Sequence, residues 1–276
     1  MPRAAGKRGR RRPTQAERAD RHVLYERAVQ NVDFEVEFVT DTFKALRRRR
    51  PHIVREDFCG TANAACAWVR AHPRNRAIGV DLDPDVLDWG RRHHVAALTR
   101  GQQRRLQLIQ GDVLKVRTDP VDAVLAMNFS YWCFKTRPLL KRYFKRVREH
   151  LVDDGIFFLD AYGGYEAHQE LREETDHGRF IYVWDQAEYD PMSGHMTTHI
   201  HFKFPDGSRL DRAFTYHWRL WTLPELRELL DEAGFSRVTV YAQGWDEARD
   251  EPSDTFEPVE RLDADAGWVA CLVAEK

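Results

Sequence analysis

The stretch IVREDFCGTA, residues 53–62, decides the fold because it is typical of a strand, a tight loop and the start of a helix. An open α/β sheet binds its ligands at such a turn, at the carboxyl ends of its strands. Gly60 allows close approach of the backbone, and the helix that follows offers free N–H groups to a ligand. The stretch therefore predicts a binding loop.

Strands and helices alternate on the carboxyl side of this loop. The predicted strands are residues 52–56, 76–81, 106–110, 121–126 and 155–160. The predicted helices are residues 62–71, 84–98 and 138–151, preceded by one or two helices within residues 14–46 that end before Pro51. Near-continuous apolar strands that alternate with helices indicate a parallel sheet covered on both faces.

Beyond residue 160 the pattern changes to strands without helices between them. Residues 179–189, 195–204 and 209–221 predict an antiparallel sheet, with a turn at 205–207. A helix over 223–233, ended by Gly234, and strands over 235–241 and 268–274 complete the chain. We expect a basic disordered arm (1–13), a helical segment (14–50), an α/β core (51–160), an inserted antiparallel lid (161–221) and the C-terminal part of the core (222–276).

The composition excludes several classes of protein. The 276 residues carry 43 Lys and Arg against 44 Asp and Glu, and no apolar run approaches the ~18 residues of a membrane span. The basic start has no apolar stretch behind it, so a secretory signal is not expected. Four cysteines form no CxxC pair and indicate reduced thiols in a cytoplasmic protein. The charges are uneven: residues 1–21 are basic, and residues 246–265 are acidic.

Two acids follow the binding loop at informative positions. Asp81 ends the second strand, 21 residues after Gly60, where a carboxylate reaches the ribose hydroxyls of an adenosine cofactor. Gly111-Asp112 ends the third strand, where a further acid reaches the adenine side. Each feature alone is common, and their order along the chain is the specific signal.

This ordered set resembles the class I S-adenosylmethionine-dependent methyltransferases. The segments that carry the resemblance are residues 56–62, 79–83 (GVDLD), 110–113 (QGDV), 126–129 (AMNF), 155–160 (GIFFLD) and 223–235. The resemblance covers about residues 50–275 and implies an α/β fold with a doubly wound, seven-stranded Rossmann-like sheet, here with the antiparallel β lid. It also implies S-adenosyl-L-methionine as the cofactor.

The resemblance further assigns roles to residues of this chain. Glu56 would lie behind the methionine end of the cofactor, Asp81 would bind the ribose and Asp112 the adenine. The other implied cofactor-binding residues are Phe58, Cys59, Gly60, Thr61, Leu82, Val113, Met127 and Asn128. The family usually has glycines where Phe58 and Ala62 stand, so we expect the loop to use ordinary φ values at these two positions.

The predicted lid carries two aromatic faces. Phe180, Tyr182 and Trp184 alternate along one strand, and Phe214, Tyr216 and Trp218 alternate along another. Such faces surround a cationic amine through cation–π contacts, or else pack the lid against the core. The expected substrate-binding residues are Trp132, Tyr162, Tyr182, Trp184, Tyr216 and Trp218, with Asn128 and Tyr131 as catalytic residues beside the methyl group.

Three histidines, His195, His199 and His201, share one face of the next strand. We expect no metal there, because methyl transfer needs none and no neighbouring Cys or carboxylate is evident. His201 is the predicted general base, with plain surface histidines as the alternative. Tyr25 lies in the predicted N-terminal helix. Its side chain either folds over the cofactor or takes part in the packing of that helix.

The predicted function is methyl transfer to a small molecule, with N-methylation favoured over O-methylation. The layout is nearest to the small-molecule N-methyltransferases. Two alternatives stay open: an RNA or protein methyltransferase that uses the basic arm, and a non-catalytic cofactor-binding scaffold. The expected partner is a small methyl acceptor. Nucleic acid is not favoured, no membrane is expected, and a homodimer through the lid is left open.

Overall fold

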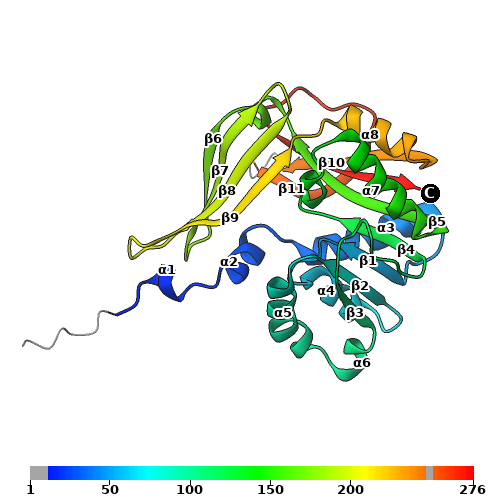
Figure 1. The fold of residues 1–276 in the computed structure, drawn as a ribbon, viewed down its shortest axis with the longest axis horizontal. Helices are drawn as coiled ribbons and strands as arrows, with labels where there is room; N and C mark the ends of the chain where they lie inside the picture. Colours follow the sequence, from blue (N-terminus) through cyan, green and yellow to red (C-terminus); the bar gives the residue numbers. More distant parts are fainter. Residues whose placement is uncertain (1–11, 247–250) are drawn as a thin grey trace, which may run out of the picture.

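The centre of the molecule is a mostly parallel sheet. The computed structural model describes residues 12–246 and 251–276, and within these ranges eight strands form the sheet in the order β11-β10-β12-β5-β4-β1-β2-β3 (Figure 1). The strands are β1 (Ile53–Asp57), β2 (Arg76–Asp81), β3 (Leu106–Gln110), β4 (Val121–Ala126), β5 (Leu151–Gly163), β10 (Arg237–Asp246), β11 (Glu251–Val259) and β12 (Trp268–Glu275). Strands β1 to β5 run parallel, and β12 pairs antiparallel with β5 and with β10.

The strand order reverses between β1 and β4, which lie side by side. β1 leads outward to β2 and β3, whereas β4 leads the other way to β5. The crevice at the carboxyl ends of β1 and β4 is therefore the topological switch point, where open α/β sheets bind ligands.

Helices cover both faces of the sheet. They are α1 (Gln15–Arg18), α2 (Arg21–Ala28), α3 (Val32–Arg47), α4 (Asn63–Ala71), α5 (Pro84–His93), α6 (Arg100–Gln103), α7 (Arg137–Glu149) and α8 (Leu223–Glu232), with short 3-10 helices at Val95–Ala97, Ser130–Cys133 and Tyr165–His168. Phe144 of α7 and Leu229 of α8 belong to one core, and Phe43 of α3 and Trp68 of α4 belong to the other. Alternate residues of each strand enter these two cores, as expected for a sheet buried on both sides.

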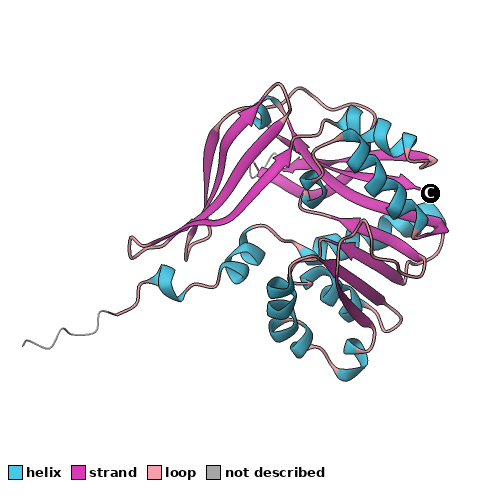
Figure 2. Ribbon diagram, in the orientation of Figure 1, coloured by secondary structure: helices cyan, strands magenta, loops and turns pink. Residues whose placement is uncertain are grey.

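A separate antiparallel sheet projects beside the carboxyl edge of the core (Figure 2). Its strands, in spatial order, are β6 (Leu171–Asp176), β7 (Ile181–Asp190), β8 (His195–Lys203) and β9 (Arg209–Arg219). Leu24 of α2 packs against this lid through Phe180 and Phe202, and the backbone N–H of Gln15 donates to Asp206. The N-terminal helices thus join the lid to the core.

The predicted fold class is confirmed, with two corrections. The described residues form eight core strands rather than seven, because part of the acidic segment 246–265 becomes β11 and pairs with β10. The lid has four described strands, since β6 pairs with β7 although its sequence, LREETD, has no apolar alternation. The basic arm lies outside the described residues over 1–11. No helix in the part of the chain that the structure describes is long and apolar enough to span a membrane.

Candidate functional site

The loop after β1 is tied to the end of β2 by one carboxylate. The Gly60 N–H donates to Asp81 Oδ2 at 2.7 Å, and the Asp83 N–H donates to Asp81 Oδ1 at 2.9 Å. A Cβ built on Gly60 meets no atom within 4 Å, so open space lies over this residue. The loop and Asp81 thus form a cradle at the carboxyl edge, in the place that the sequence predicted.

The expectation of ordinary φ values in this loop is wrong. Phe58 has φ 59° and Ala62 has φ 60°, so both residues occupy the left-handed region that favours glycine. The Phe58 ring packs against Phe134 and Tyr143, with centroids 5.8 and 5.6 Å away. The backbone therefore keeps a glycine-type path, and packing of the substituted side chains offsets its strain.

Two further loop residues are held by neighbouring elements. The Cys59 side chain is buried against Gly79 of β2, where an added Cβ would lie 2.8 Å from Cys59 Sγ. The Thr61 hydroxyl donates to Glu26 of α2 at 2.6 Å. The Cys59 side chain is therefore engaged in packing, and its backbone N–H and carbonyl bond to Val80 and Ala62.

A cluster of acids lies behind the loop. Glu56 accepts the Ala65 N–H at 2.9 Å, and burial and the nearby Glu35 raise its pKa well above the ordinary value. Burial, together with the Asp160 carboxylate, raises the pKa of Glu35 to about 8. Neither Glu35 nor Glu56 forms an ion pair with a Lys or Arg in the described part of the chain, and the largest causes of both shifts are burial and neighbouring acids. The cluster therefore suits a ligand that carries positive charge.

Asp160, near the carboxyl end of β5, holds the turn after β4. Its carboxylate accepts the Asn128 N–H at 2.7 Å and the Phe129 N–H at 2.8 Å. Both turn residues are left-handed, with φ 58° and 56°. Burial raises the pKa of Asp160 to about 7, although both N–H groups oppose this. Asp160 is a positioning residue that the resemblance did not assign.

The adenine side of the predicted site is less enclosed. Asp112 accepts the Leu114 N–H at 2.9 Å, and Lys115 lies 3.4 Å from its other oxygen. Val113 is buried, whereas Leu82, beside Asp81, is 69% exposed. An exposed leucine next to the cradle provides an apolar surface for a base. The roles predicted for Asp112, Val113, Leu82 and the half-buried Met127 stay predictions.

A cavity of about 550 Å³ opens beside the cradle, between the lid and the core. Of the predicted substrate-binding residues, those that line it are Tyr162, Tyr182, Trp184, Tyr216 and Trp218. Asn128 also lines it, as do Tyr25 of α2 and Trp268 of β12. Gly163 makes room for the Trp268 ring, since a Cβ there would lie 2.1 Å from Trp268 Cζ2.

Sequence reasoning missed several residues that line this cavity. They are Phe129, Glu173, Ile200, Trp245 and Trp268, among others. Glu173 was missed because β6 was not predicted. Ile200 stands between His199 and His201, so strand alternation places its side chain on the opposite face, together with other apolar residues. The sequence could therefore have identified it.

Three predicted site residues do not reach the cavity. His201 lies on the opposite face of the lid, where its Nε2 lies 3.0 Å from Asp185 Oδ2, so a role as general base is contradicted. Tyr131 is fully buried and donates to the Asp160 carbonyl at 2.7 Å, which is a structural role. Trp132 is also fully buried, and it supports the cavity wall by packing on Tyr162 and Trp218.

No group of three or more His, Cys, Asp or Glu within the described ranges could hold a metal ion. His199 bonds to the Thr215 hydroxyl at 2.9 Å, and His195 is exposed at the start of β8. His199 and His201 are therefore engaged in hydrogen bonds within the lid, whereas the His195 side chain is exposed.

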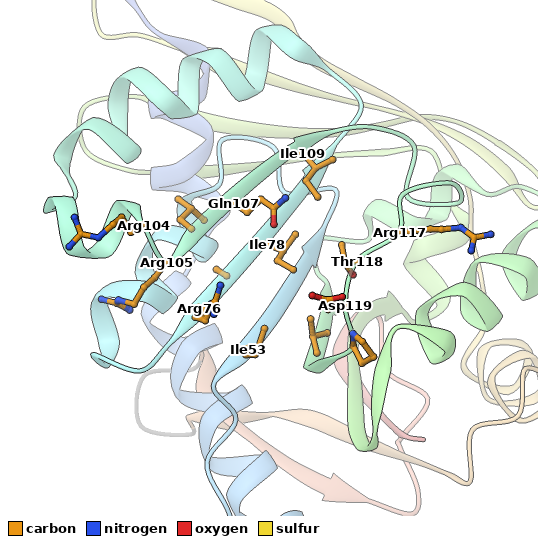
Figure 3. A pocket seen from close by; sticks show the side chains of 14 residues that line it. Ile53, Arg76, Ile78, Arg104, Arg105, Gln107, Ile109, Arg117, Thr118 and Asp119 are labelled. Atoms are coloured by element: carbon orange, nitrogen blue, oxygen red, sulfur yellow. The ribbon is translucent and has the colours of Figure 1, made fainter.

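A second cavity, of about 600 Å³, lies at the other edge of the sheet (Figure 3). Ile53, Arg76 and Leu106, which begin strands β1, β2 and β3, line it. Figure 3 shows Arg104 and Arg117 pointing away from its isoleucines. This cavity extends from the amino ends of the strands along one face of β2 and β3 to Ile78 and Ile109, and it shares no residue with the cradle.

Comparison with known proteins agrees with this geometry. Residues 56–155 match the family model described as a methyltransferase domain. A S-adenosylmethionine-dependent methyltransferase from Clostridium acetobutylicum ATCC 824 is similar at 17% identity, with a TM-score of 0.67, over 92% of this chain and 96% of that one. No curated protein matches the sequence.

Two further solved structures share the fold. CalS10, an amino pentose methyltransferase from Micromonospora echinaspora, has 14% identity and a TM-score of 0.64 over 92% of this chain and 95% of its own. The sugar N-methyltransferase KedS8 from Streptoalloteichus sp ATCC 53650 has 14% identity and a TM-score of 0.62 over 100% and 99%. At these identities the likeness concerns the fold, and it includes the lid.

Proposed function

We propose that this chain, whose residues 56–155 match the model of a methyltransferase domain, transfers a methyl group from S-adenosyl-L-methionine to an amine of a small molecule. The observation that carries the proposal is the pairing of an acid-rich cradle at the switch point with an aromatic cavity beside it. Asn128 and Phe129, which follow β4, line the cavity and donate their N–H groups to Asp160, one of the buried acids.

The cradle fits the cofactor on two grounds. Open space over Gly60 leaves room for a ligand against the backbone, and Asp81 borders that space. The acids Glu35, Glu56 and Asp160 have no cationic partner among the described residues, which suits a molecule with an ammonium and a sulfonium group. Asp81 would hold the ribose hydroxyls, and Glu56 would lie near the amino-acid end.

When bound, S-adenosyl-L-methionine supplies a sulfonium methyl group, whose transfer to a nitrogen lone pair leaves a neutral thioether. The chain's own residues position the acceptor and exclude water, which can account for much of such a rate enhancement. An ammonium acceptor must first lose one proton. Within the described lining of the cavity, Glu173 and Asp265 are the groups able to accept it, because burial keeps the nearby tyrosines neutral.

Amine acceptors are favoured by two observations. Aromatic faces of the lid line the cavity, and such faces attract cationic amines. Two structures that share the fold over nearly the whole chain are described as an amino pentose methyltransferase and a sugar N-methyltransferase. The cytoplasmic location stays a prediction, supported by four free cysteines.

Calorimetry with S-adenosylhomocysteine tests the cofactor assignment directly. We expect micromolar or tighter binding that Asp81→Asn weakens at least tenfold. A folded sample that binds neither S-adenosylhomocysteine nor S-adenosylmethionine would refute the proposal. A metabolite pool incubated with methyl-labelled cofactor then identifies the acceptor mass, and labelled RNA or protein instead of a small molecule would favour the alternative function.

A further inference from the structure

The walls of the acceptor cavity are unusually aromatic. Tyr216 stacks on Trp218 with ring centroids 4.4 Å apart, and Trp184 lies 6.4 Å from Trp218. Tyr162 meets Trp184 edge-on at 6.2 Å, so rings from β5, β7 and β9 form one continuous surface. Tyr25 of α2 lines the same cavity, and its ring lies 5.0 Å from that of Phe214 of β9. Rings in such an arrangement suit a flat apolar ligand.

The charged residues of the cavity are all acidic. None of its described lining residues is a Lys or Arg, whereas Glu173 and Asp265 are part of the lining. A phosphate group would meet two carboxylates and no cation there, and its binding would therefore be opposed. A cationic amine, by contrast, would be attracted by the acids and by the faces of the rings.

Strand alternation explains why Glu173 faces the cavity. In β6 the neighbouring residues Arg172 and Glu174 form ion pairs with Asp185 and Lys203. Glu173 lies directly across from Trp184, a lining residue, and the structure gives it no ion pair among the described residues. Its carboxylate is therefore available to an acceptor, while the carboxylate of Glu174 is already paired.

We propose that the acceptor is an amine carried on a flat, aromatic body without a phosphate, and that Glu173 recognises its positive charge. This inference rests on the proposed function and narrows its substrate class. The cavity volume of about 550 Å³ is in the range that encloses a small organic molecule. The acids oppose binding of phosphorylated or nucleotide-linked amines, and a polar sugar would cover less of the ring surface than a flat aromatic ring does.

A matched ligand series tests the inference by calorimetry on the full chain saturated with S-adenosylhomocysteine. The probes are tyramine, N-acetyltyramine, O-phosphotyramine and glucosamine. We expect tyramine to bind at least tenfold more tightly than each of the other three. Failure of tyramine to bind, or binding of O-phosphotyramine or glucosamine as tight as that of tyramine, would overturn the inference.

Glu173→Gln and Glu174→Gln provide the matched variants. We expect Glu173→Gln to weaken tyramine binding about tenfold and to leave N-acetyltyramine unchanged, whereas Glu174→Gln changes neither. Equal effects of the two variants would refute the role of Glu173. Binding of S-adenosylhomocysteine is measured in every sample, because its loss would count against the proposed function and its retention isolates the acceptor question.

Discussion

Replacing Ala62 by glycine is expected to leave the stability of the chain nearly unchanged. Ala62 is fully buried at the start of α4, with φ 60° and ψ 29°, and its carbonyl accepts the Cys66 N–H at 2.9 Å. Truncation of a buried alanine normally destabilises a protein. Here the left-handed backbone supplies an opposing contribution.

The magnitudes can be worked from the structure. Relief of the left-handed strain contributes about 1–2 kcal/mol in favour of glycine. The greater freedom of glycine in the unfolded chain costs about 0.4–1 kcal/mol. The lost methyl group costs about 0.8 kcal/mol of burial free energy. These contributions cancel to within about 1 kcal/mol, so Ala62→Gly should be close to neutral.

Ala64 is the matched control, because it is 3% exposed and lies inside the same helix with no positive φ. Ala64→Gly loses the same methyl group and about 1 kcal/mol of helix propensity, which makes it about 2 kcal/mol destabilising. In urea unfolding, with an m-value of about 3 kcal/mol/M, its midpoint should fall by roughly 0.7 M, while that of Ala62→Gly should stay near wild type.

An Ala62→Gly midpoint as low as that of Ala64→Gly would refute the reasoning. It would mean that the left-handed conformation of the loop is not the one adopted in solution, and that alanine at this position costs nothing. The m-values of all three proteins must agree for the midpoints to be compared as stabilities.

The other predictions concern the acids and the lid. Asp81→Asn should weaken S-adenosylhomocysteine binding at least tenfold in calorimetry, while the circular dichroism spectrum stays unchanged. An unchanged affinity would contradict the proposal that Asp81 binds the cofactor. The folded pKa of Glu35, about 8, lies above its ordinary 4.5, so the folded chain holds an extra proton and its unfolding free energy should fall as pH rises from 4.5 to 8. In urea titrations at several pH values, Glu35→Gln should lessen this fall in unfolding free energy. A pH dependence identical to that of the wild type would contradict the raised pKa of Glu35. His201→Asn should leave the pH profile of turnover unchanged, because His201 faces away from the cavity. Loss of the acidic limb, the fall in turnover at low pH as a general base is protonated, would restore His201 as the base.

The core strands could be predicted because burial on both faces leaves a clear apolar signal. The second strand has the same bounds, 76–81, in the sequence and in the structure. β6 and β11 have no such signal. The sequence of β6, LREETD, is mostly exposed, and β11 lies in an acidic segment. Both are strands because a neighbouring strand offers a ladder of hydrogen bonds, which is a tertiary effect.

The candidate site was predictable where position along a strand decides the chemistry. The positions of Asp81 and Gly60 follow from strand ends alone; the hydrogen bond that joins them was not predicted. The φ values of the loop did not follow, because side-chain identity gives a preference that packing overrides. The role of His201 failed for another reason: alternation shows which residues share a face, but the packing of the lid on the core decides which face meets the cavity.

One short helix, α2, connects the two halves of the site. Its Glu26 accepts the Thr61 hydroxyl of the cofactor loop and lies 2.7 Å from His94, while Tyr25, one residue earlier, lines the acceptor cavity. By thermodynamic linkage, any change that the cofactor makes in acceptor affinity must be matched by an equal change in cofactor affinity when the acceptor binds. The N-terminal helix α2 thus contacts both the cradle and the aromatic cavity, and it lies outside the residues that carry the methyltransferase match.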